Sequence, residues 1–376
     1  MKKIPLFLTM LTASMAFTSC KKDEVEDPSG KTPLTIPSEY VSADYDANTV
    51  TEASLRSQFK ALSDAMKAGN NVANKVDAGN LNNLFTAGSP SLKSVTDATY
   101  ASNVETWFDM ISASSQNTFD LQNRGVGGVY GGNRLLDQYG VETLQLVEKG
   151  LYTALFYNYM LNIMDGAMTE ADVDRLVSAI GAHASFPNSS STKPANPDVN
   201  LANYICRRDK NDGNGFYTNM KVALIKLKAA IKAGSNYNTE REEAKTAIRN
   251  NIEKGLMATV VNYAHSAITK FSSTSPNEAT LAGGLHDLSE TAGFIHGLRS
   301  VPASKRTISD AQIDQLLEKL HVPANGTHAL YLFASEPAAQ VSRLAELIDI
   351  VKGVYSFTDA EINTDFKQNW VQVQDR

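Results

Sequence analysis

The sequence is poor in cysteine and carries no excess of positive charge. Only two cysteines, Cys20 and Cys206, occur among 376 residues, which excludes a framework of several disulfides. The formal net charge of −6 argues against nucleic acid or an anionic lipid surface as the main partner. A lone cysteine such as Cys206 is most often a small buried apolar residue, and we expect that environment for it. The remaining composition, with 42% hydrophobic residues, predicts a globular protein with a sizeable core.

No apolar run of membrane-spanning length follows the N-terminus, and the run at the N-terminus is itself too short to span a bilayer. Lys2 and Lys3 precede this short apolar stretch, as in a bacterial export signal. Phe17-Thr18-Ser19 then leads into Cys20, and small residues directly before such a cysteine resemble the lipobox of bacterial lipoproteins. The resemblance implies a signal peptide over residues 1–19, cleavage before Cys20 and lipidation of its thiol. We therefore expect an outer-membrane lipoprotein that is held by its acyl chains.

Residues 20–50 contain charges and prolines but little apolar periodicity, which predicts a lipidated N-terminus followed by a flexible tether. Within this stretch, Lys22-Asp23-Glu24 has two interpretations. It is a solvated spacer, or it is similar to the acidic surface-export signal of some Gram-negative lipoproteins. Because the second interpretation places the body on the cell exterior, a periplasmic and a cell-surface location both stay open.

Strand-like alternation is rare in the sequence, whereas helical spacing recurs almost throughout from Glu52 onward. Apolar side chains repeat at three- and four-residue steps, as at Leu55, Phe59, Leu62 and Met66. This pattern predicts an all-α body over residues 51–376. The breaks between its helices include Gly69-Asn70-Asn71, a glycine-rich loop at 123–133 and a Ser/Pro/Asn-rich loop at 186–200.

A short internal echo raises the question of duplication. Val147-Glu148-Lys149-Gly150-Leu151 nearly coincides with Ile252-Glu253-Lys254-Gly255-Leu256, and an apolar helical stretch follows each copy. Two bundles related by duplication would produce this echo, and so would chance, since the match is short.

The sequence contains no HExxH zinc helix and no serine nucleophile elbow, and its glycine-rich segment lacks the Lys-Ser/Thr of a phosphate-binding loop. We therefore assign no catalytic residue. The richest segment is residues 283–299, where His286 and Glu290 are four positions apart. On a helix they share a face, where they can ligate iron or another divalent metal, or form a buried hydrogen-bonded pair that fixes helix contacts.

A second polar segment covers residues 139–151. Its helical spacing gives one face that consists of Glu142, Gln145 and Lys149. Gly150 lies within the same helix, where glycine costs ~1 kcal/mol relative to alanine, so we expect close helix packing around it. Gly293 and Gly297 in the richer segment are also four apart, which predicts a groove for a neighbouring helix.

These two segments resemble a family of helical lipoproteins of unknown function in Gram-negative bacteria that is related to the imelysins. The resemblance covers most of the chain after the signal. It rests on Gly140, Glu142, Gln145, Lys149, Gly150, Leu151, His286, Leu288, Ser289, Glu290, Gly293, Phe294, Leu298 and Arg299. Imelysins carry a Gly-x-His-x-x-Glu motif; Gly284-Leu285-His286 is similar to its first half, and Glu290 stands one position later than its acid. The resemblance implies a body of two helical bundles and a link to iron acquisition, in a family whose members were also labelled peptidases.

From these observations we expect a lipid-anchored outer-membrane binding protein that acts in iron or haem acquisition beside a TonB-dependent receptor. His286 and Glu290 would form its ligand or metal site, with Glu142 as a helper from a facing helix. Two alternatives are kept. One is a metallopeptidase of the imelysin type, because a helix that bears His and Glu is compatible with it. The other is a surface interaction module without a small ligand, in which the same residues would be sealed in the core.

Overall fold

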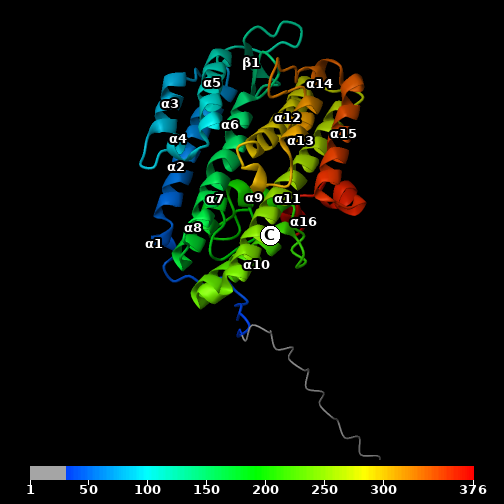
Figure 1. Ribbon diagram of the computed structural model, residues 1–376. Helices are drawn as coiled ribbons and strands as arrows, with labels where there is room; N and C mark the ends of the chain where they lie inside the picture. The colour runs from blue at the N-terminus through cyan, green and yellow to red at the C-terminus, as the bar shows by residue number, and fades with distance from the viewer. Residues whose placement is uncertain (1–30) are drawn as a thin grey trace, which may run out of the picture. The chain divides into compact units, whose positions relative to one another are not determined.

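The structure, a computed structural model, describes residues 31–376 (Figure 1). Within this range the chain from Leu34 to Arg376 forms one compact body. The predicted signal peptide over residues 1–19, the lipidation site Cys20 and the motif that begins at Lys22 lie outside the described residues and stay predictions.

Helices dominate the described chain, which confirms the predicted all-α class. The helices before residue 184 are α1 (Tyr45–Asn48), α2 (Val50–Lys67), α3 (Ala78–Thr86), α4 (Leu92–Val95), α5 (Ala98–Ser114), α6 (Thr143–Leu151), α7 (Asn158–Asp165) and α8 (Glu170–Ile180). Those after it are α9 (Asn200–Arg207), α10 (Phe216–Ala233), α11 (Asn238–Phe271), α12 (Glu278–Leu298), α13 (Asp310–Lys319), α14 (Leu332–Ser335), α15 (Pro337–Tyr355) and α16 (Trp370–Val373). Short 3-10 turns cover Ala68–Asn70, Ser235–Tyr237 and Ala303–Lys305, and π-helical turns cover Tyr152–Tyr157 and Glu361–Asp365.

The apolar stripe predicted in the first long helix is confirmed in α2. Leu55, Leu62 and Met66 are fully buried there, and Phe59 is nearly so. The helix gives way to a 3-10 turn at Ala68–Asn70, where the glycine and asparagine signal predicted its end. Apolar burial at helical spacing is therefore what holds this helix against the body.

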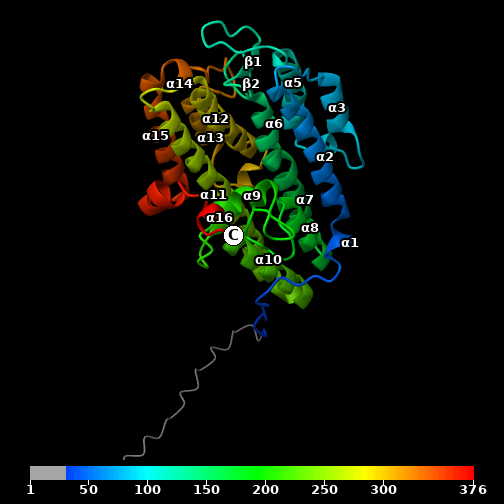
Figure 2. The same cartoon turned by 180° about the vertical axis from the view of Figure 1, so that it is seen from behind.

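The centre of the body is built by α6, α11 and α12. Helix α12 packs against both α6 and α11, and α11 also packs along α10 and α15. Figures 1 and 2 show that the earlier helices α2, α3 and α5 lie on one flank of this centre, while α15 lies on the other. The two segments singled out in the sequence thus fall on neighbouring central helices.

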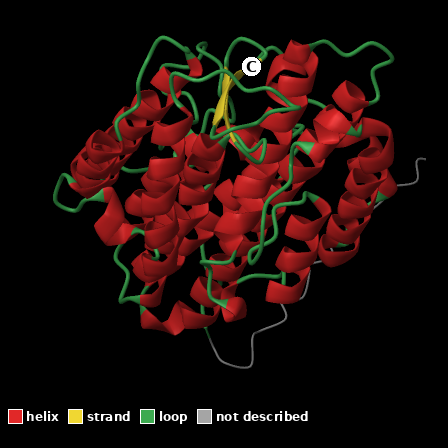
Figure 3. Ribbon diagram, turned by 90° about the horizontal axis from the view of Figure 1, so that it is seen from above, coloured by secondary structure: helices red, strands yellow, loops and turns green. Residues whose placement is uncertain are grey.

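A β-hairpin occurs where the sequence indicated only a glycine-rich loop. Strands β1 (Gly127–Tyr130) and β2 (Arg134–Asp137) pair antiparallel, with Tyr130 opposite Arg134 (Figure 3). Gly131 and Gly132 have positive φ angles in the intervening turn, a conformation that glycine adopts without strain. The backbone of Val129 also bonds to residues 117 and 119, so a third segment stabilises the hairpin. Local alternation is too short to reveal it, because each strand has only four residues.

The helical body begins earlier than the predicted boundary at residue 51. Tyr40 and Tyr45 are buried, and the Tyr40 hydroxyl donates to Asp174 Oδ1 over 2.5 Å. The same carboxylate accepts bonds from Ser42 and Asn48. Residues 34–50, assigned to the tether from their composition, are therefore part of the body.

The two copies of the Glu-Lys-Gly echo lie on α6 and α11, which differ in length. Helix α6 has nine residues and continues into a π-helical turn, whereas α11 runs for 34 residues. Both copies belong to the same compact body, and the duplication stays a prediction. Among the residues that the structure describes, no helix is long and apolar enough to cross a bilayer.

Candidate functional site

Helices α6 and α12 approach closely because glycines line their contact. A Cβ atom on Gly293 would lie 2.4 Å from the Gln145 carbonyl oxygen, and one on Gly297 would lie 2.8 Å from the Gly150 carbonyl oxygen. The groove predicted from the spacing of these two α12 glycines is confirmed.

Gly150 itself packs against α5. A Cβ at this position would overlap the Tyr100 hydroxyl, which donates to the Leu146 carbonyl oxygen over 2.7 Å. The expected close packing around this glycine is thus confirmed. It explains why a residue with poor helix propensity stands inside α6.

His286 on α12 faces Glu142, the residue directly before α6. Their Nδ1 and Oε2 atoms are 2.6 Å apart. Because a carboxylate only accepts, the imidazole proton lies on Nδ1 and the ring is oriented by Glu142. The Glu142 carboxylate also accepts from Gln145 Nε2 over 3.3 Å, and its backbone N–H donates to Ser289 Oγ over 2.9 Å. The predicted helper and the predicted histidine therefore meet across the two helices.

Glu290 lies on the other side of the His286 ring. Its Oε1 atom is 3.7 Å from His286 Nε2 and 3.0 Å from Lys149 Nζ. Lys149 also lies 3.3 Å from Glu148 Oε1, and Lys67 on α2 lies 3.1 Å from Glu148 Oε2. Basic and acidic side chains alternate along this row. We call the row the α6–α12 network; its members are Lys67, Glu148, Lys149, Glu290, His286 and Glu142.

Most of this network is sealed from solvent. The side chain of Glu142 is 0% exposed and that of Glu290 is 6% exposed, whereas the His286 side chain is 17% exposed. Of the three predicted site residues, only His286 offers an edge to a ligand from outside.

Mutual attraction keeps the buried carboxylates ionised. Burial by itself raises the pKa of Glu290, but Lys149 and His286 outweigh burial and hold the pKa below its usual range. Burial also opposes ionisation of Glu148, yet Lys149 and Lys67 lower its pKa to about 2. Burial lowers the pKa of Lys149, and the surrounding carboxylates outweigh it, so that pKa lies well above its usual value.

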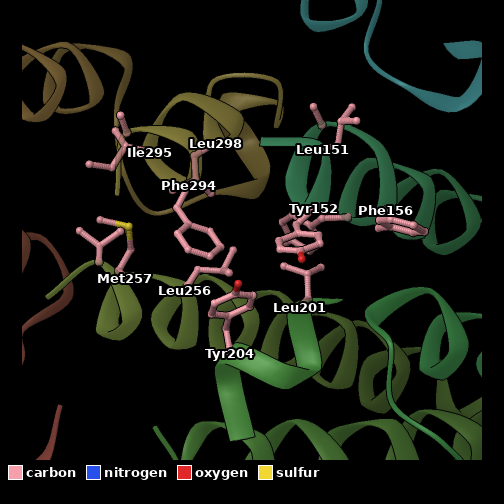
Figure 4. Close-up of a cluster of buried hydrophobic side chains, with 14 of the residues drawn as sticks. Leu151, Tyr152, Phe156, Leu201, Tyr204, Leu256, Met257, Phe294, Ile295 and Leu298 are labelled. Carbon is pink, nitrogen blue, oxygen red and sulfur yellow. The ribbon is translucent and has the colours of Figure 1, made fainter. Parts of the chain in front are cut away.

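An aromatic layer covers the Lys149 ammonium. Lys149 Nζ lies 5.2 Å from the Tyr204 ring centroid and 5.6 Å from that of Tyr152, which adds cation–π attraction. Phe294 on α12 packs edge-on against Tyr204, with centroids 5.0 Å apart. Figure 4 shows these rings together with aliphatic side chains from α6, α9, α11 and α12. The network is therefore part of the core of the body.

A metal ion fits this arrangement poorly. The Glu290 oxygen that faces His286 Nε2 is the one that Lys149 already contacts, so an added cation would lie beside an ammonium group. Glu142 engages the opposite ring nitrogen and is directed away from that position. Within residues 31–376, no three His, Cys, Asp or Glu side chains are grouped so that they could hold a metal. The metal assignment to His286 and Glu290 stays a prediction against which this geometry weighs.

Cys206 and His296 both have structural environments. Cys206 is buried as expected, and burial raises the pKa of its thiol to about 12. His296, which lies on a different face of α12 from Glu290, packs edge-on against the rings of Tyr100 and Trp107. Burial lowers the pKa of His296 to about 4, so the ring is neutral at pH 7.

Sequence reasoning missed three partners of the predicted residues. Glu148 and Lys67 extend the network on the α6 side, and Ser289 fixes the Glu142 backbone from α12. Glu148 directly precedes Lys149 and gave a local signal, since an acid beside a buried lysine is a candidate counter-charge. Lys67 gave none, because 81 residues separate it from Glu148.

Comparison with known proteins identifies one related domain. Residues 184–349 match the model of a domain of unknown function, DUF4856. The match includes His286 and Glu290 but not Glu142, and it supports a domain of unknown function without naming the imelysins. A search of curated proteins finds no significant match, and neither does a search of solved structures.

Proposed function

We propose that this protein is a lipid-anchored outer-membrane binding protein that acts in iron or haem acquisition beside a TonB-dependent receptor. The observation that carries the proposal is that two segments far apart in the sequence meet in the structure. The two segments that resemble the imelysin-related lipoproteins, residues 139–151 and 283–299, pack against each other. Their polar side chains, 144 positions apart for His286 and Glu142, form a single network. This convergence supports treating the two segments as one unit of that family.

The geometry favours binding over peptidase chemistry. A catalytic zinc needs several protein ligands and an open position for water. Lys149 contacts the Glu290 oxygen that such a metal would use, and Glu142 holds the other side of the His286 ring. Iron would therefore reach the protein as a complex rather than as a bare ion held by His286 and Glu290.

Burial favours a second candidate function, the surface interaction module without a small ligand. That alternative predicts sealed polar residues, and Glu142 and Glu290 match this expectation. The exposed edge of His286 distinguishes the two functions at this site, because a ligand held by His286 requires that edge and a purely structural role does not.

The anchor is tested by labelling cells with a radioactive or clickable fatty acid. The wild-type protein is expected to take up the label, and a Cys20→Ala variant is expected to lose it, because the thiol is the acylated atom. An unlabelled wild-type protein would remove the lipid anchor from the proposal.

The role in acquisition is tested by growth of a deletion strain when iron or haem is limiting. Complementation with the wild-type gene is expected to restore growth, and complementation with His286→Ala is expected to fail. His183→Ala is the matched control, since that ring bonds to Ser185 in its own loop and packs edge-on against Tyr45, and neither residue belongs to the α6–α12 network. Equal growth with all four genotypes would favour the interaction module.

A further inference from the structure

A second region of the body carries positive charge without matching negative charge. A cleft of about 710 Å³ lies between α9, α11 and the segment that leads into α16. Four basic side chains line it: Arg207, Arg208, Lys270 and Lys367. None of the residues that line the cleft is an aspartate or a glutamate, although the chain as a whole has a net charge of −6. This cleft is therefore a local concentration of positive potential.

Arg208 is the most informative of these residues. It is only 7% exposed, and its Nη1 atom donates to the Phe366 carbonyl oxygen over 2.9 Å. Its Nε atom is buried without a hydrogen-bond partner, and Arg208 forms no ion pair with any described carboxylate. Burial lowers the pKa of this guanidinium to about 10, and neighbouring Arg207 acts in the same direction. A buried cation without a counter-charge is costly, so an anion beside it would remove an existing penalty.

Arg207 and Lys367 extend this positive surface toward solvent. The Arg207 guanidinium lies 5.5 Å from the Tyr204 ring centroid, and its Nε donates to Ser190 Oγ over 3.2 Å. Lys367 is exposed, and neither residue forms an ion pair within the described chain. Lys270 differs, because its ammonium group contacts the Asp287 carboxylate. Three of the four cations are thus free of carboxylate partners.

The rest of the lining suits a polar ligand. Four side-chain amides line the cleft, from Asn262, Gln368, Asn369 and Gln372. The aliphatic side chains are limited to Ile268 and Val373. A pocket for the apolar macrocycle of haem would need far more apolar surface, whereas amide groups hydrogen-bond to the oxygens of carboxylates, phosphates and hydroxyls.

We propose that the cleft between α9, α11 and α16 binds a small organic polyanion whose carboxylate or phosphate groups are met by Arg207, Arg208 and Lys367. The proposal deepens the proposed function and rests on it in one respect: the protein is a binding protein that takes iron as a soluble complex. Polycarboxylate chelates of iron carry negative charge, so a cleft of this chemistry would admit the chelate and the free acid alike.

Calorimetric titration of the full-length protein in detergent tests the cleft. The probes are citrate, ferric citrate, a hexose phosphate, inorganic phosphate, a neutral hexose and haem. At least one organic anion is expected to bind, with affinity that falls as salt is raised. Arg207→Gln and Lys367→Gln are each expected to weaken binding by about 5- to 10-fold, because each removes a charged contact to the ligand.

Lys93→Gln provides the matched control for these variants. Lys93 is half-exposed on α4 and pairs with Glu105, away from the residues that line the cleft. The control is expected to bind the anion as tightly as the wild type. A loss equal to that of Lys367→Gln would overturn the proposal, since it would show only general charge attraction.

The remaining outcomes test the binding cleft independently of the proposed role in iron acquisition. If no organic anion binds, or if only inorganic phosphate binds, the proposal that the cleft binds an organic polyanion is overturned. The growth phenotype of the deletion strain is not affected by that result. Binding that discriminates citrate from the hexose phosphate would identify the acidic group. Anion binding in a protein whose deletion has no iron phenotype would support the cleft and contradict the proposed function.

Discussion

Two sets of charged side chains in this protein contact the same aromatic ring, that of Tyr204, but are organised in opposite ways. In the α6–α12 network, each cation lies beside a carboxylate, as Lys149 does beside Glu290. In the cleft, Arg208 is buried with no carboxylate to balance it. Tyr204 takes part in both, since it covers Lys149 and lines the cleft. The difference indicates that internal compensation makes the network part of the scaffold, while the lack of compensation makes the cleft receptive to an anion.

The comparison also shows that residues that form a conspicuous sequence pattern need not be the ones that solvent or a ligand can reach. His286, Glu290 and Glu142 are the residues that stand out in the sequence, yet two of them are sealed. The cleft residues form no motif, yet they line an open volume of about 710 Å³. A recognisable pattern of polar residues therefore does not show whether the site is open to a ligand, and accessibility must be read from the structure.

Removing Lys149, the central cation of the α6–α12 network, should lower the free energy of unfolding more than any other change considered. Lys149→Met leaves the Glu148 and Glu290 carboxylates buried without their shared partner, and we expect a loss of about 3–5 kcal/mol in the free energy of unfolding. Urea denaturation measures it. Lys60→Met, which removes one member of an exposed pair with Asp64, is the control and should change stability by less than about 0.5 kcal/mol. A loss below about 1 kcal/mol for Lys149→Met would mean that the network does not stabilise the fold.

Acid should weaken the same network in a defined window. The folded-state pKa of Glu148 is about 2, below its unfolded value of 4.5, so its ionised form contributes stability above pH 4.5. That contribution is lost as the pH falls from 4.5 towards 2. The difference in unfolding free energy between the wild type and Glu148→Gln should therefore shrink by about 2–3 kcal/mol over this window. Urea titrations of both proteins from pH 7 to pH 2.5 measure it, and a constant difference would contradict the ion pairing.

The next largest loss of stability should come from the close contact between α6 and α12, not from a charge. Gly293→Ala would push a methyl group against the Gln145 backbone oxygen, and we expect a loss of about 2 kcal/mol despite the better helix propensity of alanine. Gly353→Ala in α15 is the control, because its Cβ would meet no atom within 4 Å. That variant should gain about 0.5–1 kcal/mol. Thermal unfolding of both proteins measures these changes. If both variants gain stability or both lose it, close α6–α12 packing is not the reason for Gly293.

The smallest effect should come from the cleft. Lys367→Gln removes an exposed cation that has no carboxylate partner, so stability should change by less than about 0.5 kcal/mol. The same urea experiment measures it beside Lys149→Met. A loss of more than about 1 kcal/mol would show that Lys367 has a structural partner, and the contrast between the two regions would disappear.

Local pattern was sufficient to predict the helices and the glycine contacts. The stripe at Leu55, Leu62 and Met66 fixes one face of α2 because side chains three and four positions apart share a face. Gly150 was identified by its cost in a helix, which close packing offsets, and Gly293 was identified by its four-residue spacing from Gly297. The hairpin at Gly127–Asp137 escaped prediction because its strands of four residues are too short to show an alternating pattern. The docking of Tyr40 escaped prediction because its partner, Asp174, is distant in the sequence.

By itself the sequence determined the helical class, the paired glycines and the candidacy of His286, Glu290 and Glu142, since each depends on spacing within one segment. Only the tertiary structure decided that Lys149 forms an ion pair with Glu290 and that Arg208 has no counter-charge. The cleft joins residues 204–208, 259–270 and 367–373. Electrostatic balance is a property of distances in space, and helices brought together by apolar burial set those distances without leaving a local signal in the chain.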